Sequence, residues 1–148
     1  NGLIEAIQKR VIRDKRPFLG ICVGQQLMAT TGLENDIQTK GFDWVSGTVE
    51  RIKPTNPTLK IPHMGWNTLE FDRKHELFEG IKSKDHAYFI HSYHFLLDNS
   101  TDRISYTDYG QKITAAVLKD NMVGTQFHPE KSQSVGLTFI KNFLLWQP

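Results

Sequence analysis

One short segment, Gly20-Ile21-Cys22-Val23-Gly24, constrains the fold more than any other part of the sequence. It matches the pattern G-x-nucleophile-x-G, in which the chain turns sharply from a strand end into a helix and holds the nucleophile at the apex. A side chain at either glycine would collide with such a turn. The segment therefore predicts a strand before Cys22, a helix after it and a reactive thiol between them.

The sequence on both sides of Cys22 fits this interpretation. Phe18-Leu19-Gly20-Ile21 is a short apolar run, typical of a buried parallel strand. Residues 23–31 read as a helix that ends at Gly32. At a helix N-terminus the pKa of the Cys22 thiol would be lowered. The backbone N–H of Val23 would then face the oxyanion of a tetrahedral intermediate.

A second segment, Phe127-His128-Pro129-Glu130, supplies the groups that such a thiol requires. Proline favours an extended backbone at the residue before it, and residues i and i+2 of an extended segment share a face. His128 and Glu130 can therefore lie together as a general base and the carboxylate that orients it. A His-Pro-Glu run alone is more typical of a surface turn, so the prediction depends on its combination with Cys22.

The remaining sequence indicates an α/β fold with a mixed sheet and an antiparallel extension, spanning residues 1–148. Apolar spacing predicts helices over 2–14 and 135–146 and one or two helical turns over 76–81. The segment 62–65 is turn-like, and Lys119-Asp120-Asn121 fits a hairpin turn. The predicted strands are 45–52, 66–71, 87–95, 113–118 and 122–127.

Composition and charge exclude several classes of function. Eighteen basic and 16 acidic residues are spread along the 148-residue chain, so we expect no nucleic-acid or membrane partner. A single cysteine excludes an internal disulfide and favours a reducing, cytoplasmic location. His91 and His94 would face opposite sides of one strand, which is poor geometry for a metal site, so we expect none.

These motifs together resemble those of a known family. Residues 20–28, Gly-Ile-Cys-Val-Gly-Gln-Gln-Leu-Met, and 126–132, Gln-Phe-His-Pro-Glu-Lys-Ser, are similar to the nucleophile and His-x-Glu segments of class I (triad-type) glutamine amidotransferases. Residues 62–67 and 89–93 resemble a branch of that family, the glutaminase subunits of imidazole glycerol phosphate synthases. The resemblance covers essentially the whole sequence and implies a Rossmann-like α/β sandwich.

The resemblance also implies a reaction, with no cofactor. Cys22 would attack the side-chain amide of L-glutamine while His128 moves the proton and Glu130 holds His128. A glutamyl thioester would form and be hydrolysed to glutamate. The released ammonia would pass through a tunnel into a (βα)8-barrel synthase partner in histidine biosynthesis.

Further positions carry over from the family. Gln26, one helical turn after Cys22, resembles the residue that holds the substrate glutamine, and Glu34 resembles an acidic contact to the substrate amino group. Ser92 and Tyr93 fall in the segment that lines the pocket. The resemblance assigns a last set to the synthase interface: His63, Met64, Gly65, Trp66, Asn67 and Lys131.

The sequence departs from the family at its start. Family members carry about three more strand–helix units upstream, including a glycine-rich loop that supplies a second oxyanion N–H. No such loop precedes Cys22, so we expect an N-terminally truncated domain with half an oxyanion hole.

Three alternatives remain open. The ammonia could serve another acceptor, such as a sugar amidation enzyme. The chain could be a stand-alone Cys–His–Glu hydrolase, such as a γ-glutamyl peptidase. It could also be a non-catalytic regulatory subunit.

Overall fold

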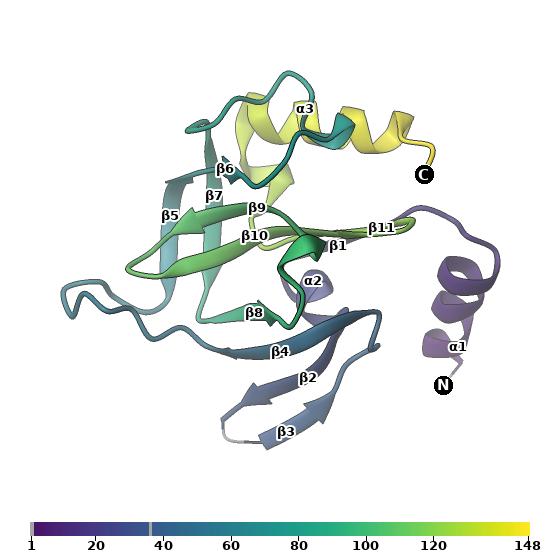
Figure 1. Cartoon of the computed structure of the whole chain (residues 1–148), viewed down its shortest axis with the longest axis horizontal. Helices are drawn as coiled ribbons and strands as arrows, with labels where there is room; N and C mark the ends of the chain where they lie inside the picture. The colour runs from purple at the N-terminus through teal and green to yellow at the C-terminus, as the bar shows by residue number, and fades with distance from the viewer. Residues whose placement is uncertain (1, 36) are drawn as a thin grey trace.

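The computed structural model describes residues 2–35 and 37–148, and these form layers of sheet and helix (Figure 1). The central layer is a five-stranded sheet. Helix α3 (Gln133–Leu145) covers one of its faces, and a four-stranded sheet lies on the other. In order, the central sheet contains β1 (Phe18–Ile21), β11 (Met122–Thr125), β10 (Lys112–Lys119), β9 (Arg103–Asp108) and β6 (Glu70–Phe71).

Both larger sheets mix parallel and antiparallel pairs, as the sequence predicts. In the central sheet β1 runs parallel to β11, whereas β10 is antiparallel to both of its neighbours. In the second sheet β2 is parallel to β4 and antiparallel to β3. This sheet contains, in order, β3 (Ile37–Lys40), β2 (Ala29–Glu34), β4 (Val45–Arg51) and β8 (Tyr93–Leu97).

A two-stranded ribbon completes the strands, with β5 (His63–Thr68) antiparallel to β7 (His86–His91). The residues described also form four short helical turns, and α1 (Leu3–Gln8) continues into the first of them as a π-helix. These turns are η1 (Lys9–Arg13), η2 (Glu76–Phe78), η3 (Ser100–Asp102) and η4 (Pro129–Lys131). No helix among the residues described is long and apolar enough to cross a membrane.

Two apolar cores lie on opposite faces of the central sheet. Met122 and Val123 are adjacent in β11 and point into different cores, as the two-residue period of a strand requires. One core packs Phe89, Phe127 and Phe139 between the sheet and α3. The other lies between the central sheet and the four-stranded sheet and includes Met28, Ala29, Trp44, Val45 and Phe95. The apolar positions whose spacing predicts the helix over 135–146 contact the first core.

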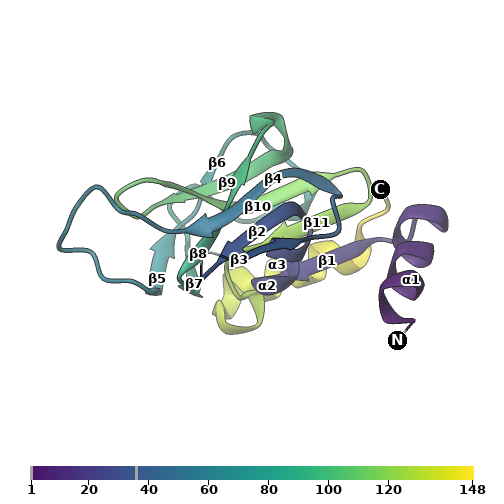
Figure 2. The same cartoon turned by 90° about the horizontal axis from the view of Figure 1, so that it is seen from below.

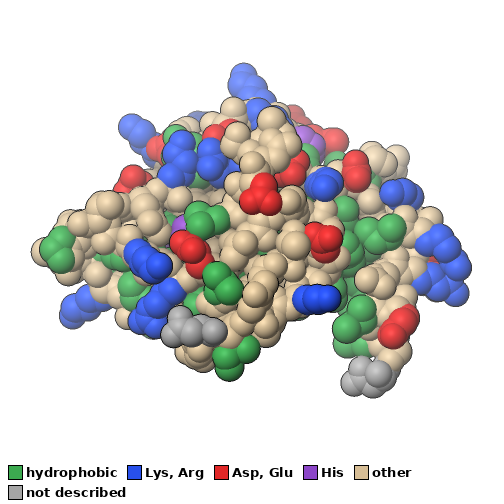
Figure 3. All heavy atoms as spheres, turned by 60° about the horizontal axis from the view of Figure 1, so that its bottom comes forward, with side chains coloured by type: hydrophobic (Ala, Val, Ile, Leu, Met, Phe, Trp, Pro, Cys, Tyr) green, Lys and Arg blue, Asp and Glu red, His purple; other side chains and the backbone are tan. Residues whose placement is uncertain are grey.

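Helix α1 stands apart from the sheets beside β1 in both perpendicular views (Figures 1 and 2). Its connection to the body is partly polar, because the buried Asn121 side chain donates to the carbonyls of Val11 at 2.9 Å and Arg16 at 2.7 Å. Ile7 of α1 and the buried Val11 also pack against the second core. Over the face that carries α1, acidic and basic side chains are interspersed (Figure 3).

The predicted helix over residues 23–31 is wrong in its second half. Helix α2 (Val23–Leu27) ends after five residues, and the chain continues as β2 from Ala29. The β-branched Thr30 and Thr31 favour a strand. Pairing with β3 on one edge and β4 on the other then overrides the helical pattern, and Gly32 lies within the strand.

Two other predicted strands are each divided between sheets. The segment 87–95 breaks at Ser92, where the chain passes from the ribbon into the four-stranded sheet. The segment 66–71 breaks at Leu69, whose N–H donates to the Asp85 carbonyl at 2.8 Å. Residues 63–65 belong to β5 and are not a turn, because they pair with β7.

Candidate active site

The turn at Cys22 has the geometry that the sequence predicts. Cys22 lies between β1 and α2 with φ 52° and ψ −104°, a conformation that is strained for a residue with a side chain. Its N–H donates to the Thr125 carbonyl at 2.7 Å, which ties the turn to the end of β11. A Cβ added to Gly20 would lie 2.5 Å from the Gly24 carbonyl oxygen, so this position requires glycine.

The second glycine of the motif does not fit the same explanation. A Cβ added at Gly24 would meet no heavy atom within 4 Å among the residues described. Its φ is also not among the positive values found at other glycines. The expectation that both glycines avoid a collision is therefore confirmed for Gly20 and wrong for Gly24.

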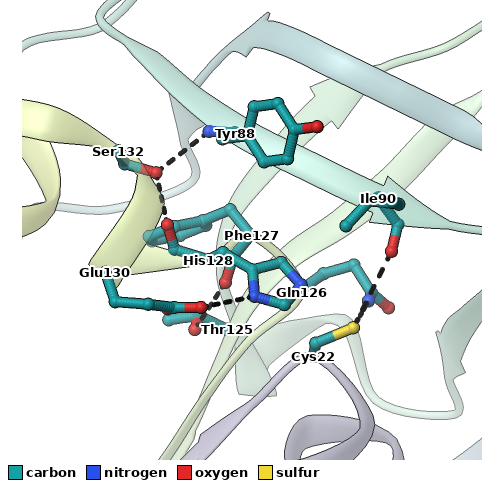
Figure 4. Close-up of polar contacts among 9 residues, drawn as sticks. All are labelled: Cys22, Tyr88, Ile90, Thr125, Gln126, Phe127, His128, Glu130 and Ser132. Carbon is teal, nitrogen blue, oxygen red and sulfur yellow. Dashed lines mark hydrogen bonds and ion pairs between the residues drawn. The ribbon is translucent and has the colours of Figure 1, made fainter.

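His128 and Glu130 follow β11 and lie together, as predicted, but the backbone is extended only at His128, because Pro129–Lys131 form the 3-10 turn η4. The His128 Nδ1 and Glu130 Oε1 atoms are 2.7 Å apart. Backbone contacts hold the histidine in place, because its N–H donates to the Tyr88 carbonyl at 2.9 Å and its carbonyl accepts from Ser132 Oγ at 2.6 Å. The ring lies between Glu130 and Cys22 (Figure 4). Its Nε2 atom is buried and has no hydrogen-bond partner among the residues described.

The Cys22 thiol has two polar neighbours that the sequence analysis did not single out. Gln126 Nε2 donates to the Cys22 sulfur at 3.6 Å, and the thiol can donate to the Ile90 carbonyl at 3.9 Å. Gln126 is fully buried. One signal could have identified it, because a glutamine two residues before His128 in an extended segment shares its face.

The expected lowering of the Cys22 pKa is wrong for the isolated chain. Burial raises the pKa of the Cys22 thiol, and the negative charge of Glu130 acts in the same direction. The Val23 N–H, the positive charge of Lys131 and the Gln126 amide oppose this increase without overcoming it. A five-residue helix also supplies little dipole. The thiol therefore rests protonated and needs a base.

Three of the four residues expected to bind substrate line one cavity. It has a volume of about 130 Å³ and is bordered by Val23, Gln26, Glu34 and Tyr93, among others. Ser92 is not part of its lining and instead accepts the Ile52 N–H through its carbonyl at 2.9 Å. A larger hollow of about 830 Å³ lies beside η2 and contains none of the expected site residues.

The segment expected at the interface is divided between surface and interior by the alternation of β5. Met64 and Trp66 are 59% and 48% exposed, whereas His63 is 2% exposed. Lys131 is exposed, with its Nζ 5.9 Å from the centre of the Tyr88 ring, and Trp66 contacts the same ring edge-on. His63 therefore cannot present its side chain to a partner in this conformation.

The expectations for the other histidines also change. His91 and His94 lie in different strands, β7 and β8, and not on opposite faces of a single strand. Among the residues described, no cluster of three or more His, Cys, Asp or Glu side chains is arranged to hold a metal ion.

Comparison with known proteins bears on this geometry. The family model described as glutamine amidotransferase class-I matches residues 1–146. The chain belongs to this family. In this chain Cys22 follows the end of β1 and His128 follows the end of β11, with Glu130 on the Nδ1 side of the histidine.

Curated relatives within the glutamine amidotransferases carry a more specific name. The imidazole glycerol phosphate synthase subunit HisH of Cereibacter sphaeroides is 57% identical over 147 residues, which cover 99% of this chain and 69% of the relative. The subunits of the same name from Ruegeria pomeroyi and Brucella melitensis are 56% and 51% identical, with the same coverage.

Solved structures support the fold alone. A glutamine amidotransferase from Thermotoga maritima superposes with a TM-score of 0.64 at 20% identity, over 95% of this chain and 52% of that one. Another glutamine amidotransferase gives a TM-score of 0.65 at 20% identity, over 96% and 68%. The chain thus spans about half to two thirds of these structures.

Proposed function

We propose that this chain is a glutaminase in which Cys22 is the nucleophile, His128 the base and Glu130 the group that orients His128. One observation carries the proposal. His128 has Nδ1 fixed by Glu130 at 2.7 Å, while its buried Nε2 is free on the side where Cys22 lies. An imidazole held in this way can accept a thiol proton.

The reaction follows from these positions. His128 Nε2 takes the Cys22 proton, which is needed because burial raises the pKa of that thiol. The sulfur adds to the carboxamide carbon of glutamine, and the Val23 N–H stabilises the oxyanion. The C–N bond breaks as the imidazolium returns its proton to the leaving ammonia. Water, deprotonated by His128, then hydrolyses the thioester to glutamate and free thiol.

The cavity lined by Val23, the residue that follows Cys22, is our candidate for the glutamine pocket. Gln26 and Tyr93 line it with Glu34, whose carboxylate can pair with the substrate amino group. Ser92 would help through its position in the chain, since it joins β7 to β8 beside the pocket.

We further propose that the ammonia passes to an imidazole glycerol phosphate synthase partner with a (βα)8-barrel fold, in the histidine pathway of the cytoplasm. The relatives' shared name as subunits of that synthase supports this assignment. The exposed Met64 and Trp66, with Asn67 and Lys131, would face the partner, while His63 and Gly65 would support that strand from behind.

The test is glutamate release from glutamine by the purified protein, with and without the barrel subunit and its nucleotide ligand. Strong stimulation by the liganded partner, absent in Cys22→Ala, is the expected result. Equal turnover without the partner would favour a stand-alone hydrolase. Turnover stimulated only by a sugar amidation enzyme would identify a different acceptor. No turnover with any partner would favour a regulatory subunit.

A further inference from the structure

Two buried histidines form a contact that the proposed reaction does not use. His63 Nδ1 and His91 Nε2 are 2.9 Å apart across the β5–β7 ribbon, where the two residues are paired. Their side chains are 2% and 6% exposed. The His63 ring is stacked between Phe89 and Tyr109.

The Tyr93 carbonyl sets the direction of this contact. His91 Nδ1 lies 2.8 Å from that oxygen, which can only accept, so His91 Nδ1 must carry the hydrogen. A neutral His91 then has an unprotonated Nε2 that accepts, and His63 Nδ1 must donate to it. His63 Nε2 in turn must accept, and Asn67 Nδ2 donates to it at 3.2 Å.

The hydrogen bonds of the Asn67 side chain support this assignment independently. Asn67 Nδ2 also lies 2.8 Å from the Asp108 carbonyl, so that atom must be the nitrogen. Asn67 Oδ1 accepts from the Thr68 N–H at 2.8 Å, which fixes the same orientation a second time. Every nitrogen of both histidines is therefore occupied, with one consistent set of hydrogens.

The same carbonyl also sets the orientation of groups that lead to the nucleophile. Gln26 Nε2 donates to the Tyr93 carbonyl at 3.0 Å and to Gln126 Oε1 at 3.1 Å. Because Gln126 Oε1 accepts there, its Nε2 must face the Cys22 sulfur, at 3.6 Å. The Tyr93 carbonyl therefore receives one hydrogen bond from the histidine pair and one from the groups that contact the thiol.

We propose that these residues form one hydrogen-bond network in which the donor of every bond is fixed, with two arms that meet at the Tyr93 carbonyl: one from Asn67 through His63 and His91, the other from Gln26, which also reaches Cys22 through Gln126. In this network His63 and His91 act as positioning residues. They hold the Tyr93 peptide, and thereby the two glutamine amides, against the thiol. The kinetic part of the inference rests on the proposed glutaminase function, whereas the assignment of hydrogens does not.

The donor and acceptor roles of the two rings are preserved because both rings stay neutral. Burial lowers the pKa of His91 to about 3 and that of His63 to about 4. Protonation of His91 would also place two N–H groups on the 2.9 Å contact between the rings. Both imidazoles therefore stay neutral at the pH of catalysis.

The first experiment is a long-range ¹H–¹⁵N spectrum of the ¹⁵N-histidine-labelled protein from pH 8 to pH 5. We expect two histidines, assigned through His63→Gln and His91→Gln, with Nδ1 protonated and Nε2 bare across this range. Protonation at Nε2 of His91, or titration of either ring near its ordinary pKa, would overturn the assignment. This measurement needs no enzyme activity.

The second experiment compares two substitutions at one position. His91→Asn keeps an N–H donor near the place of Nδ1, whereas His91→Gln places its amide near Nε2 and loses that donor. For His91→Gln we expect kcat for glutamine to fall on the order of tenfold, with KM changed less, because small misplacements slow chemistry more than binding. His91→Asn should retain most of kcat, and His86→Gln, at an exposed histidine of the same strand, should match the parent.

The rate of Cys22 alkylation by iodoacetamide against pH supplies a readout independent of glutamine. The Gln126 amide lowers the thiol pKa, so loss of its alignment should move the alkylation profile of His91→Gln to higher pH than that of His91→Asn. Identical profiles and equal kcat for the two variants would refute the positioning role and leave the proposed function intact. A parent that alkylates as expected but never hydrolyses glutamine would refute only the function.

Asn67→Asp tests the network if His91 variants do not fold, because residue 67 is partly exposed. A carboxylate there has no hydrogen to donate, so His63 Nε2 should become protonated in the same spectrum. An unchanged bare Nε2 would contradict the network.

Discussion

The molecule contains two imidazole centres that differ in what surrounds their nitrogens. His128 has a carboxylate on Nδ1, and its Nε2 has no hydrogen-bond partner in the part of the chain that the structure describes. His63 and His91 have every nitrogen hydrogen-bonded within the chain, and their partners are a carbonyl, an amide and each other. The first centre lies beside the thiol, whereas the second lies inside the ribbon.

This difference separates chemistry from positioning. A base needs a free nitrogen that can take a proton and a neighbour that stabilises the resulting charge. His128 has both. The buried pair has neither, and burial, which lowers both pKa values, disfavours the protonated form of each ring. In our proposal His128 transfers the proton, whereas His63 and His91 contribute directional hydrogen bonds.

The largest effect is expected from removing the imidazole of His128. His128→Ala should lower kcat for glutamine by about 10⁴-fold or more, because it removes the only base placed at the thiol among the residues described. Stability should change little, since Glu130 is 48% exposed and can be solvated. Glutamate release by the partner-bound protein measures the first quantity and urea unfolding the second. Retention of a tenth of the activity would contradict the assigned role.

Next in size is removal of the charge on Glu130. Glu130→Gln should lower kcat by about 10²- to 10⁴-fold, less than His128→Ala, because the histidine remains but its tautomer and charge are no longer fixed. The maximum of the kcat–pH profile should fall, whereas KM should change less. Equal losses in the two variants would mean that Glu130 does more than orient the ring.

A smaller effect is expected at the buried pair. His63→Leu leaves His91 Nε2 without its donor, and an unsatisfied buried polar group costs about 1–3 kcal/mol. The urea midpoint should fall with an unchanged slope. His128→Ala serves as the matched histidine control and should not shift the midpoint. An unchanged urea midpoint in His63→Leu would show that the histidine pair adds no net stability.

The smallest expected effect is on the pH dependence of the free energy of unfolding, which changes only below about pH 6.5. The folded-state pKa values of His63 and His91, about 4 and 3, lie below the ordinary 6.5, so the unfolded chain binds more protons between these limits. Stability should therefore be complete above pH 6.5 and fall as the pH drops toward 4. Urea unfolding at several pH values should show a weaker dependence in a His63→Leu, His91→Leu double variant. Equal slopes would contradict this linkage.

The proposed catalytic groups could be predicted from the sequence because each lies in a local motif. The elbow at Cys22 and the His128-Pro129-Glu130 run, in which an extended His128 leads into the turn η4, impose their geometry over a few residues. Strand β1, the β10–β11 hairpin and α3 were predictable for the same reason. Their apolar patterns agree with the cores that they enter.

The features that sequence missed depend on pairing between distant segments. Residues 29–34 become a strand because β3 and β4 flank them, which the sequence of that segment does not reveal. The contact between His63 and His91 follows from the register of β5 against β7. The resting pKa of Cys22 depends on burial by strands that arrive much later in the chain.

The open space at Gly24 has a practical meaning for engineering. Alanine there should meet no obstacle, should strengthen helix α2 and should restrict the unfolded chain, a gain of about 0.4–1 kcal/mol. If Gly24→Ala raises the melting temperature and keeps full turnover, the position beside the nucleophile is free for redesign. If Gly24→Ala stabilises the protein but slows turnover, the space beside Gly24 is needed for the substrate or for a partner.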